Sequence, residues 1–127
     1  MSVPRDLRYT KDHEWVRVDG DEADIGITAY AANQLGDIVF VELPRIGTAI
    51  TAHGTFGVVE SVKAVSDLFA PLGGEVVAVN EGLTGSPESV NDDAYGAGWM
   101  IRIHVADPTQ LDELLDPDAY DTLIAAG

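Results

Sequence analysis

Residues 57–71 constrain this chain more than any other stretch. Two short apolar runs, rich in valine, flank residues 61–64, which read Ser-Val-Lys-Ala. Such runs around a short break are typical of a β-hairpin, here over about residues 55–71. The break contains Lys63, so we expect one long amine to project from the tip of the hairpin into solvent.

Lys63 has an ordinary interpretation and a functional one. A charged turn residue often protects a strand edge against unwanted pairing. An exposed ion pair contributes only about 0 to 1 kcal/mol, so stability gives weak reason to place a lysine here. Lys63 and Lys11 are the only lysines beside 22 acidic residues. Because a turn-tip amine can reach into an acylating enzyme, the functional hypothesis is a modified lysine that carries a prosthetic group.

Composition limits the classes of function. With 127 residues and 46% hydrophobic content, the chain suits one domain, residues 1–127, with a single core. It has no cysteine, so redox chemistry has to come from a cofactor. The net charge of −15 argues against nucleic acid and anionic membranes and favours partners with basic docking patches. An acid-biased, halophilic proteome would give the same composition.

Neither a secretory signal nor a membrane span is expected. Residues 1–14 mix charges without an apolar core. No stretch approaches the roughly 20 apolar residues that a spanning helix needs. We therefore expect the cytoplasm or an equivalent reducing compartment.

The rest of the chain reads as short strands with few helices. Thr28 is a plausible N-cap for a helix over residues 29–35, with Gly36 as its stop. At the C-terminal end, Asp107 followed by Pro108 opens a helical segment over about residues 108–126, interrupted at Pro117. Leu111, Leu114 and Leu115 are expected on one face of its first part. Strands are predicted at residues 13–18, 23–27, 37–43, 75–80 and 99–105, and a loop at 82–98.

Two of the predicted strands resemble each other. Residues 36–41 and 74–79 both read glycine, acid and then four mostly branched apolar residues, at a spacing of 38. This spacing hints at two related half-domains, with the Lys63 turn on the connection between them.

Several kinds of catalytic or metal site find no support in the sequence. Asp19, Asp21 and Asp24 suggest calcium, but Ala23 and Asp24 stand where the calcium loop needs a ligand and a glycine. The three histidines, His13, His53 and His104, lack metal-ligand spacing and are expected to be structural. No nucleophile elbow, phosphate loop or HExxH motif occurs. An acid pair such as Glu14 with Asp67 could serve acid/base work, but pairing cannot be read from the sequence.

Seven motifs, in order, resemble the glycine cleavage system H protein family, over about residues 9–124. They lie at residues 13–16 (His-Glu-Trp-Val), 26–31 (Gly-Ile-Thr-x-Tyr-Ala), 35–44, 59–67 (Val-Glu-Ser-Val-Lys-Ala-x-Ser-Asp), 70–71, 74–77 and 95–99 (Tyr-Gly-x-Gly-Trp). The sequence departs from the family at residues 92–95, where proline commonly precedes the tyrosine, and at Ala97, where glutamate is common.

The resemblance implies a mainly β fold, the barrel-sandwich hybrid of lipoyl and biotinyl carriers, in which two antiparallel sheets fold over one another. A short internal helix and C-terminal helices accompany the sheets. It also implies that lipoate is amide-linked to Lys63, and that Glu60 and Gly74 belong to the surface recognised by a lipoate ligase or transferase.

The resemblance further implies a carrier and not an enzyme. The lipoyl-lysine arm, which is lipoate linked to the side chain of Lys63, would receive the aminomethyl group of glycine from the pyridoxal-phosphate glycine decarboxylase. It would pass it to the tetrahydrofolate-dependent aminomethyltransferase and be reoxidised by dihydrolipoyl dehydrogenase. Because water would hydrolyse the cargo, the arm is expected to fold into a cleft. We hypothesise that Glu14 and Asp67 hold the cationic cargo there, with Ala31 and Leu35 as apolar wall.

Other classes of protein stay open at this stage. A biotin carrier would typically have methionines beside the lysine, where this chain has Val62 and Ala64. Lipoyl domains of 2-oxo acid dehydrogenases usually have Asp-Lys and lack the N-terminal His-Glu-Trp strand. Within the family, an H-like protein could donate lipoate to other enzymes. An unmodified acidic β scaffold that only binds a partner is the alternative from a different class.

Overall fold

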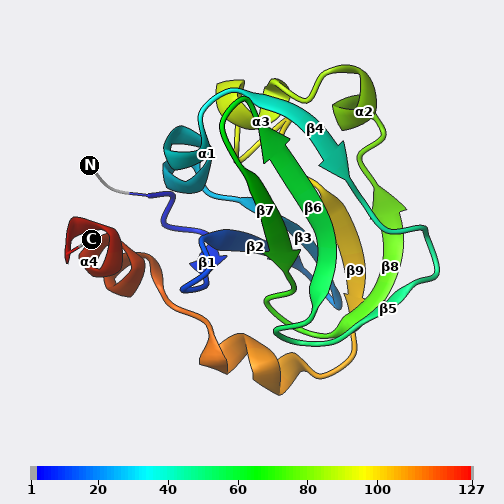
Figure 1. Ribbon diagram of the computed structural model, residues 1–127. Coiled ribbons are helices and arrows are strands. Elements are labelled where there is room, and N and C mark those ends of the chain that lie inside the picture. Colours follow the sequence, from blue (N-terminus) through cyan, green and yellow to red (C-terminus); the bar gives the residue numbers. More distant parts are fainter. Residues whose placement is uncertain (1–2, 127) are drawn as a thin grey trace.

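The computed structural model describes residues 3–126 and is mainly β, with two antiparallel sheets as predicted. In Figure 1 the three-stranded sheet, ordered β4-β6-β7, lies in front of the six-stranded sheet, ordered β1-β2-β3-β9-β8-β5. The strands are β1 (Arg8–Tyr9), β2 (Glu14–Asp19), β3 (Glu22–Ile27), β4 (Ile38–Glu42), β5 (Ala49–Ile50), β6 (Thr55–Ser61), β7 (Val65–Phe69), β8 (Gly74–Val79) and β9 (Ile101–Val105). The helical elements are α1 (Ala29–Leu35), α2 (Gly82–Gly85), α3 (Ser89–Asp92), the 3₁₀ helix η1 (Pro108–Glu113) and α4 (Pro117–Ala126).

The helix α1 begins and ends where its capping residues predict. The Thr28 side chain accepts a hydrogen bond from the Ala31 amide, which satisfies one free donor of the first turn. Gly36 follows the last residue with φ of +86°, a backbone conformation that residues with a side chain rarely adopt. Both ends are set by single local residues.

The two similar segments form one strand in each sheet, β4 and β8. β4 pairs with β6, whereas β8 pairs with β5 and β9. The hairpin of β6 and β7 lies between them in the chain, and Lys63 is in its turn.

The main core fills the space between the two sheets. Ile25 and Ile103 reach it from the six-stranded sheet, and Val59 and Leu68 from the three-stranded one. A second cluster lies where the N-terminal segment meets α4, and its fully buried members include Leu7, Tyr9, Trp15 and Tyr120. This second cluster fixes α4 against β1 and β2.

The C-terminal segment differs in part from the prediction. Its first part is a 3₁₀ helix, and the N-cap Asp107 accepts a hydrogen bond from the Thr109 amide. Leu111 and Leu114 pack against the main core. Leu115, predicted on the same face, packs into the second cluster instead, because its backbone bridges to Tyr9. The chain is extended at that point, so helical spacing no longer applies.

The predicted loop at residues 82–98 contains two single helical turns, α2 and α3. The loop includes the positions where the sequence departs from the family pattern, and Asp93 forms several hydrogen bonds there. The Asp93 carbonyl accepts from the Gly96 and Gly98 amides, and its carboxylate accepts from the Ala97 amide. The Ala94 carbonyl accepts from the Trp15 indole at 2.9 Å. The loop is therefore closed on itself and tied to β2.

Three acids at the turn between β2 and β3 pair with one arginine. The Arg102 guanidinium lies 2.9 Å from Asp24, 2.7 Å from Glu22 and 3.4 Å from Asp19. The acids near the turn therefore stabilise the pairing of β3 with β9. None of the helices within residues 3–126 combines the length and the apolar character needed to cross a membrane.

Candidate functional site

Lys63 lies at the tip of a turn whose backbone is fixed by hydrogen bonds. The Ser61 amide donates to the Ala64 carbonyl at 2.8 Å, and the Ser61 hydroxyl accepts from the amides of Lys63 and Ala64. The Val62 amide donates to the Asp37 carbonyl at 3.0 Å. The Lys63 side chain is exposed. The turn thus presents a flexible amine on a rigid support.

The stem of Lys63 lies beside the end of α1. A Cβ atom placed on Gly36 would be 3.5 Å from Lys63 Cε and 4.0 Å from a methyl of Val62. The tip of the hairpin and the C-terminal end of α1 are therefore neighbours, as Figure 1 also shows.

Glu14 is a buried acid at the first position of β2, with an exposed fraction of 2%. Its carboxyl accepts from the Thr10 hydroxyl at 2.8 Å and from the Phe69 amide at 3.3 Å. Burial raises the pKa of Glu14 to about 8, against the lowering effect of these two hydrogen bonds. A buried acid with a strongly shifted pKa is typical of a functional site.

Lys63 and Glu14 mark the two ends of strand β7. The strand starts at Val65, two residues after Lys63, and ends at Phe69, which contacts Glu14. At about 3.3 Å per residue these ends are roughly 13 Å apart. The helix α1 likewise runs between two ends, one at Lys63 and the other at Thr28. An edge strand and a helix therefore both lead from the lysine toward the buried acid.

The other residues predicted for an arm cleft lie on these two elements. Asp67 is exposed on β7, two residues before Phe69. Ala31 and Leu35 are half-buried on α1 and pack against the main core. Within residues 3–126, Glu14 and Asp67 are not hydrogen-bonded to each other. The cavity of about 380 Å³ at the base of β7 is lined by none of the four predicted residues.

Glu60 and Gly74 occupy different ends of the hairpin. Glu60 is half-buried in β6, opposite Val65 and Phe40 and close to the lysine turn. Gly74 is buried at the start of β8, beyond the base of the hairpin. A Cβ atom there would lie 2.2 Å from the His104 carbonyl oxygen, so the packing of β8 on β9 requires glycine.

Sequence reasoning missed a polar network around Tyr120. The Tyr120 hydroxyl lies 2.8 Å from His13 Nδ1 and 2.8 Å from Thr28 Oγ1. His13 has φ of +68°, and burial lowers its pKa. The contacts join residues 107 and 92 positions apart, so no local pattern could have indicated them.

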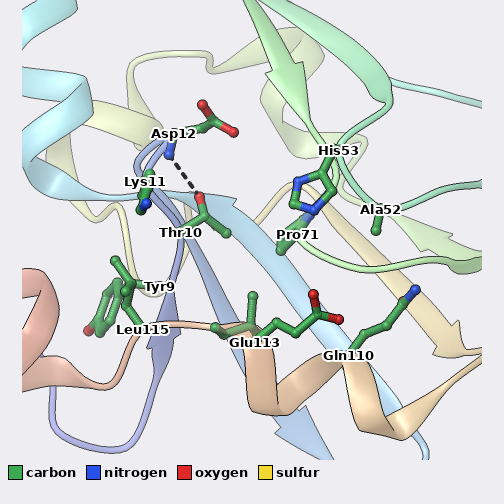
Figure 2. Close-up of a pocket in the computed structure, with 11 residues that line it drawn as sticks. Tyr9, Thr10, Lys11, Asp12, Ala52, His53, Pro71, Gln110, Glu113 and Leu115 are labelled. Atoms are coloured by element: carbon green, nitrogen blue, oxygen red, sulfur yellow. Dashed lines mark hydrogen bonds between the residues drawn. The ribbon is translucent and has the colours of Figure 1, made fainter.

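A cavity of about 380 Å³ lies at the base of β7 (Figure 2). Its lining includes Thr10, Asp12, His53, Pro71 and Glu113. Figure 2 shows the Asp12 amide bonded to the Thr10 hydroxyl, the group that also bonds Glu14. The cavity therefore adjoins the support of the buried acid.

Comparisons with known proteins show the family of this chain. The profile of the family described as "Glycine cleavage H-protein" matches residues 7–126. The glycine cleavage system H protein of Magnetococcus marinus is 59% identical over 120 residues, covering 94% of this chain and 86% of that protein. The probable glycine cleavage system H protein of Haloarcula marismortui is 58% identical, covering 94% of each chain.

A solved structure of the same family has the same fold. The crystal structure of a glycine cleavage system H protein from Mycobacterium marinum matches with a TM-score of 0.90 at 39% identity, covering 97% of this chain and 99% of that one. The chain therefore belongs to the glycine cleavage H-protein family, whose members are lipoyl carriers of the glycine cleavage system and not enzymes.

Proposed function

We propose that Lys63 is the residue to which lipoate is amide-linked. The observation that carries the proposal is the exposed amine on a turn held by Ser61, in a chain of this family. The chemistry of the site fits the group, because an acylating enzyme needs an exposed primary amine as the nucleophile that attacks the activated acyl group. When attached, lipoate supplies a dithiolane that accepts a one-carbon unit and electrons. The exposed turn would let the lipoyl-lysine enter the active sites of other proteins, and the proposed cleft would exclude water from the group that it carries.

We further propose that the surface around Lys63 is recognised by a lipoate ligase or transferase. Glu60 lies three residues before the lysine, and the ligase or transferase would contact its side chain directly. Gly74 would act through the backbone of β8, since a side chain there would push β8 away from β9. The two residues thus support recognition in different ways.

The arm would fold along β7 toward Glu14, with Asp67 on its path. A cationic aminomethyl cargo would pair with these carboxylates, and such a pair is stronger in a partly buried site than in open water. Ala31 and Leu35 would cover the arm with apolar surface and exclude water from the cargo. The same residues would release the arm readily, since they make no covalent bond to it.

The partners proposed are the glycine decarboxylase, the aminomethyltransferase and dihydrolipoyl dehydrogenase, in the cytoplasm. The net charge of −15 favours basic docking surfaces on each of them. Exposed Val62, Val65 and Phe40 lie beside Lys63 or across the strands from it and offer apolar contact at the same place. If the protein instead only donates lipoate to other enzymes, a reconstituted system will not exchange the glycine carboxyl carbon with bicarbonate.

The attachment residue is tested by intact mass before and after treatment with a lipoate ligase. The wild type and Lys11→Arg are expected to gain one lipoyl group, and Lys63→Arg none. Lys11 is the matched control because it is the chain's other lysine and is also exposed. A gain that survives Lys63→Arg, or no gain in the wild type, would remove the proposal.

The cleft is tested separately, with the protein already loaded. Glu14→Gln combined with Asp67→Asn is expected to shorten the lifetime of the cargo, because the cation then has no carboxylate partner. Loss of the carried one-carbon unit is followed by intact mass over time. An unchanged lifetime would contradict the proposed role of the two acids and leave the attachment residue unaffected.

A further inference from the structure

The Tyr120 hydroxyl joins three segments that are distant in sequence. Tyr120 comes from α4 and is fully buried. Its hydroxyl lies 2.8 Å from Thr28 Oγ1, at the start of α1, and 2.8 Å from His13 Nδ1, just before β2. In the proposed arm cleft, α1 carries the apolar wall and β2 carries Glu14, so one hydroxyl contacts the segments that lead into both.

On the helix side, Tyr120 acts through the N-cap. Thr28 Oγ1 accepts from the Ala31 amide at 3.1 Å, and the Thr28 amide donates to the His13 carbonyl at 2.9 Å. A displaced Thr28 would therefore move the first turn of α1, which carries Ala31. The start of the apolar wall depends on this cap.

On the acid side, Tyr120 acts through His13. A φ of +68° is uncommon for a residue with a side chain, and at His13 backbone hydrogen bonds to Thr10 and from Thr28 hold it. The bond from Nδ1 to Tyr120 adds a contact that fixes the side chain as well. The conformation of His13 sets the direction in which the chain enters Glu14, and hence where its carboxyl meets Thr10 and Phe69.

We propose that Tyr120 is a positioning residue of the arm cleft, holding the Glu14 side and the α1 side at a fixed separation. The inference rests on the proposed function, because the separation matters only if the arm lies between the two sides. The competing explanation is that Tyr120 only fills the second cluster with its ring.

Tyr9 provides a matched control for that explanation. The two rings stack with centroids 4.7 Å apart, and both tyrosines are fully buried. The Tyr9 hydroxyl, however, donates to the Pro4 carbonyl at 2.7 Å, away from both sides of the cleft. Tyr120→Phe and Tyr9→Phe each keep the stacked ring and remove one hydroxyl, so only the first should affect the cleft.

The first test uses the unmodified protein and amide hydrogen exchange by NMR. In Tyr120→Phe we expect exchange at the Ala31 and Phe69 amides, which bond Thr28 and Glu14, to accelerate about tenfold. Amides of β9 should keep their wild-type rates, as should all of these amides in Tyr9→Phe. Unchanged rates at Ala31 and Phe69, or an equal acceleration throughout the protein, would overturn the inference.

The second test uses the loaded protein and the lifetime of its cargo. We expect Tyr120→Phe to shorten the lifetime severalfold at a temperature where every variant is folded, and Tyr9→Phe to leave it unchanged. If the Glu14→Gln, Asp67→Asn variant shortens the lifetime and Tyr120→Phe does not, the inference about Tyr120 is wrong and the cleft stands. If neither shortens it, the cleft itself is wrong, and Tyr120 has no such role.

Discussion

Replacing Glu14 with glutamine should change how stability depends on pH. Glu14 is 2% exposed, and its pKa in the folded protein is about 8, against an ordinary value of 4.5. The folded protein therefore keeps the proton on Glu14 over a pH range in which the unfolded chain has lost it. Because the folded state binds more protons, the free energy of unfolding falls as pH rises through this range.

The size of the effect follows from the width of the range. Each pH unit between 4.5 and about 8 costs about 1.4 kcal/mol of stability, and the total levels off near 5 kcal/mol above the folded pKa. Domains of this kind are stable by only about 5 to 15 kcal/mol. Glu14 therefore lowers the free energy of unfolding by a large fraction at neutral and alkaline pH.

The assay is urea unfolding of the wild type and Glu14→Gln at pH 5, 7 and 9. Glutamine can accept from Thr10 but leaves the Phe69 amide without a good acceptor, so at pH 5 the variant should be less stable by about 1 kcal/mol. At pH 7 the order should reverse, with the free energy of unfolding of the variant higher by about 2 kcal/mol, and this difference should increase further by pH 9. Glu42→Gln, which changes an exposed acid, should leave stability unaltered throughout.

The comparison isolates Glu14, because every other titrating group is shared by the two proteins. A stability difference between wild type and Glu14→Gln that stays constant from pH 5 to pH 9 would refute the reasoning. It would mean that the carboxyl is ionised in the folded protein at an ordinary pH and that the buried site is solvated.

Two further substitutions test the support of the site. Gly74→Ala should lower the free energy of unfolding by about 1 to 3 kcal/mol, because its Cβ would meet the His104 carbonyl, whereas Gly85→Ala in open space should not; urea unfolding measures both. Thr28→Ala should cost about 1 kcal/mol through the lost N-cap of α1, and Thr28→Ser should restore most of it, as thermal unfolding followed by circular dichroism would record.

Features set by neighbouring residues could be predicted from the sequence. Thr28 and Gly36 fix the ends of α1 through bonds that span one helical turn, and Asp107 caps η1 in the same way. The lysine turn is set by Ser61, two residues from Lys63. In each case the physical cause lies within about one turn of chain, so the amino-acid types alone carry the information.

Features that depend on residues distant in the sequence could not be predicted from the sequence. Nothing around Glu14 in the sequence reveals that its carboxyl meets the amide of Phe69, 55 positions away. The burial that raises its pKa is likewise a property of the folded protein. Leu115 was predicted with Leu111 because the helical period was assumed to continue, and the bridge to Tyr9 ended it. Tertiary contacts overrode the local pattern at that point.

The position of Glu14 also explains why an acid can serve where a neutral amide would fold better. β7 is an end strand of its sheet, so its outward amides have no neighbouring strand to bond, and Glu14 takes one of them at Phe69. Glutamine would avoid the cost of burying an ionisable group, although it offers the Phe69 amide no good acceptor. Only a carboxyl can also lose its proton to pair with a cation, and a cationic cargo would favour that loss by lowering the pKa of Glu14. In the proposed arm cleft, loading near neutral pH should therefore release a proton from Glu14, so that the acid whose ionisation lowers stability would also retain the cargo.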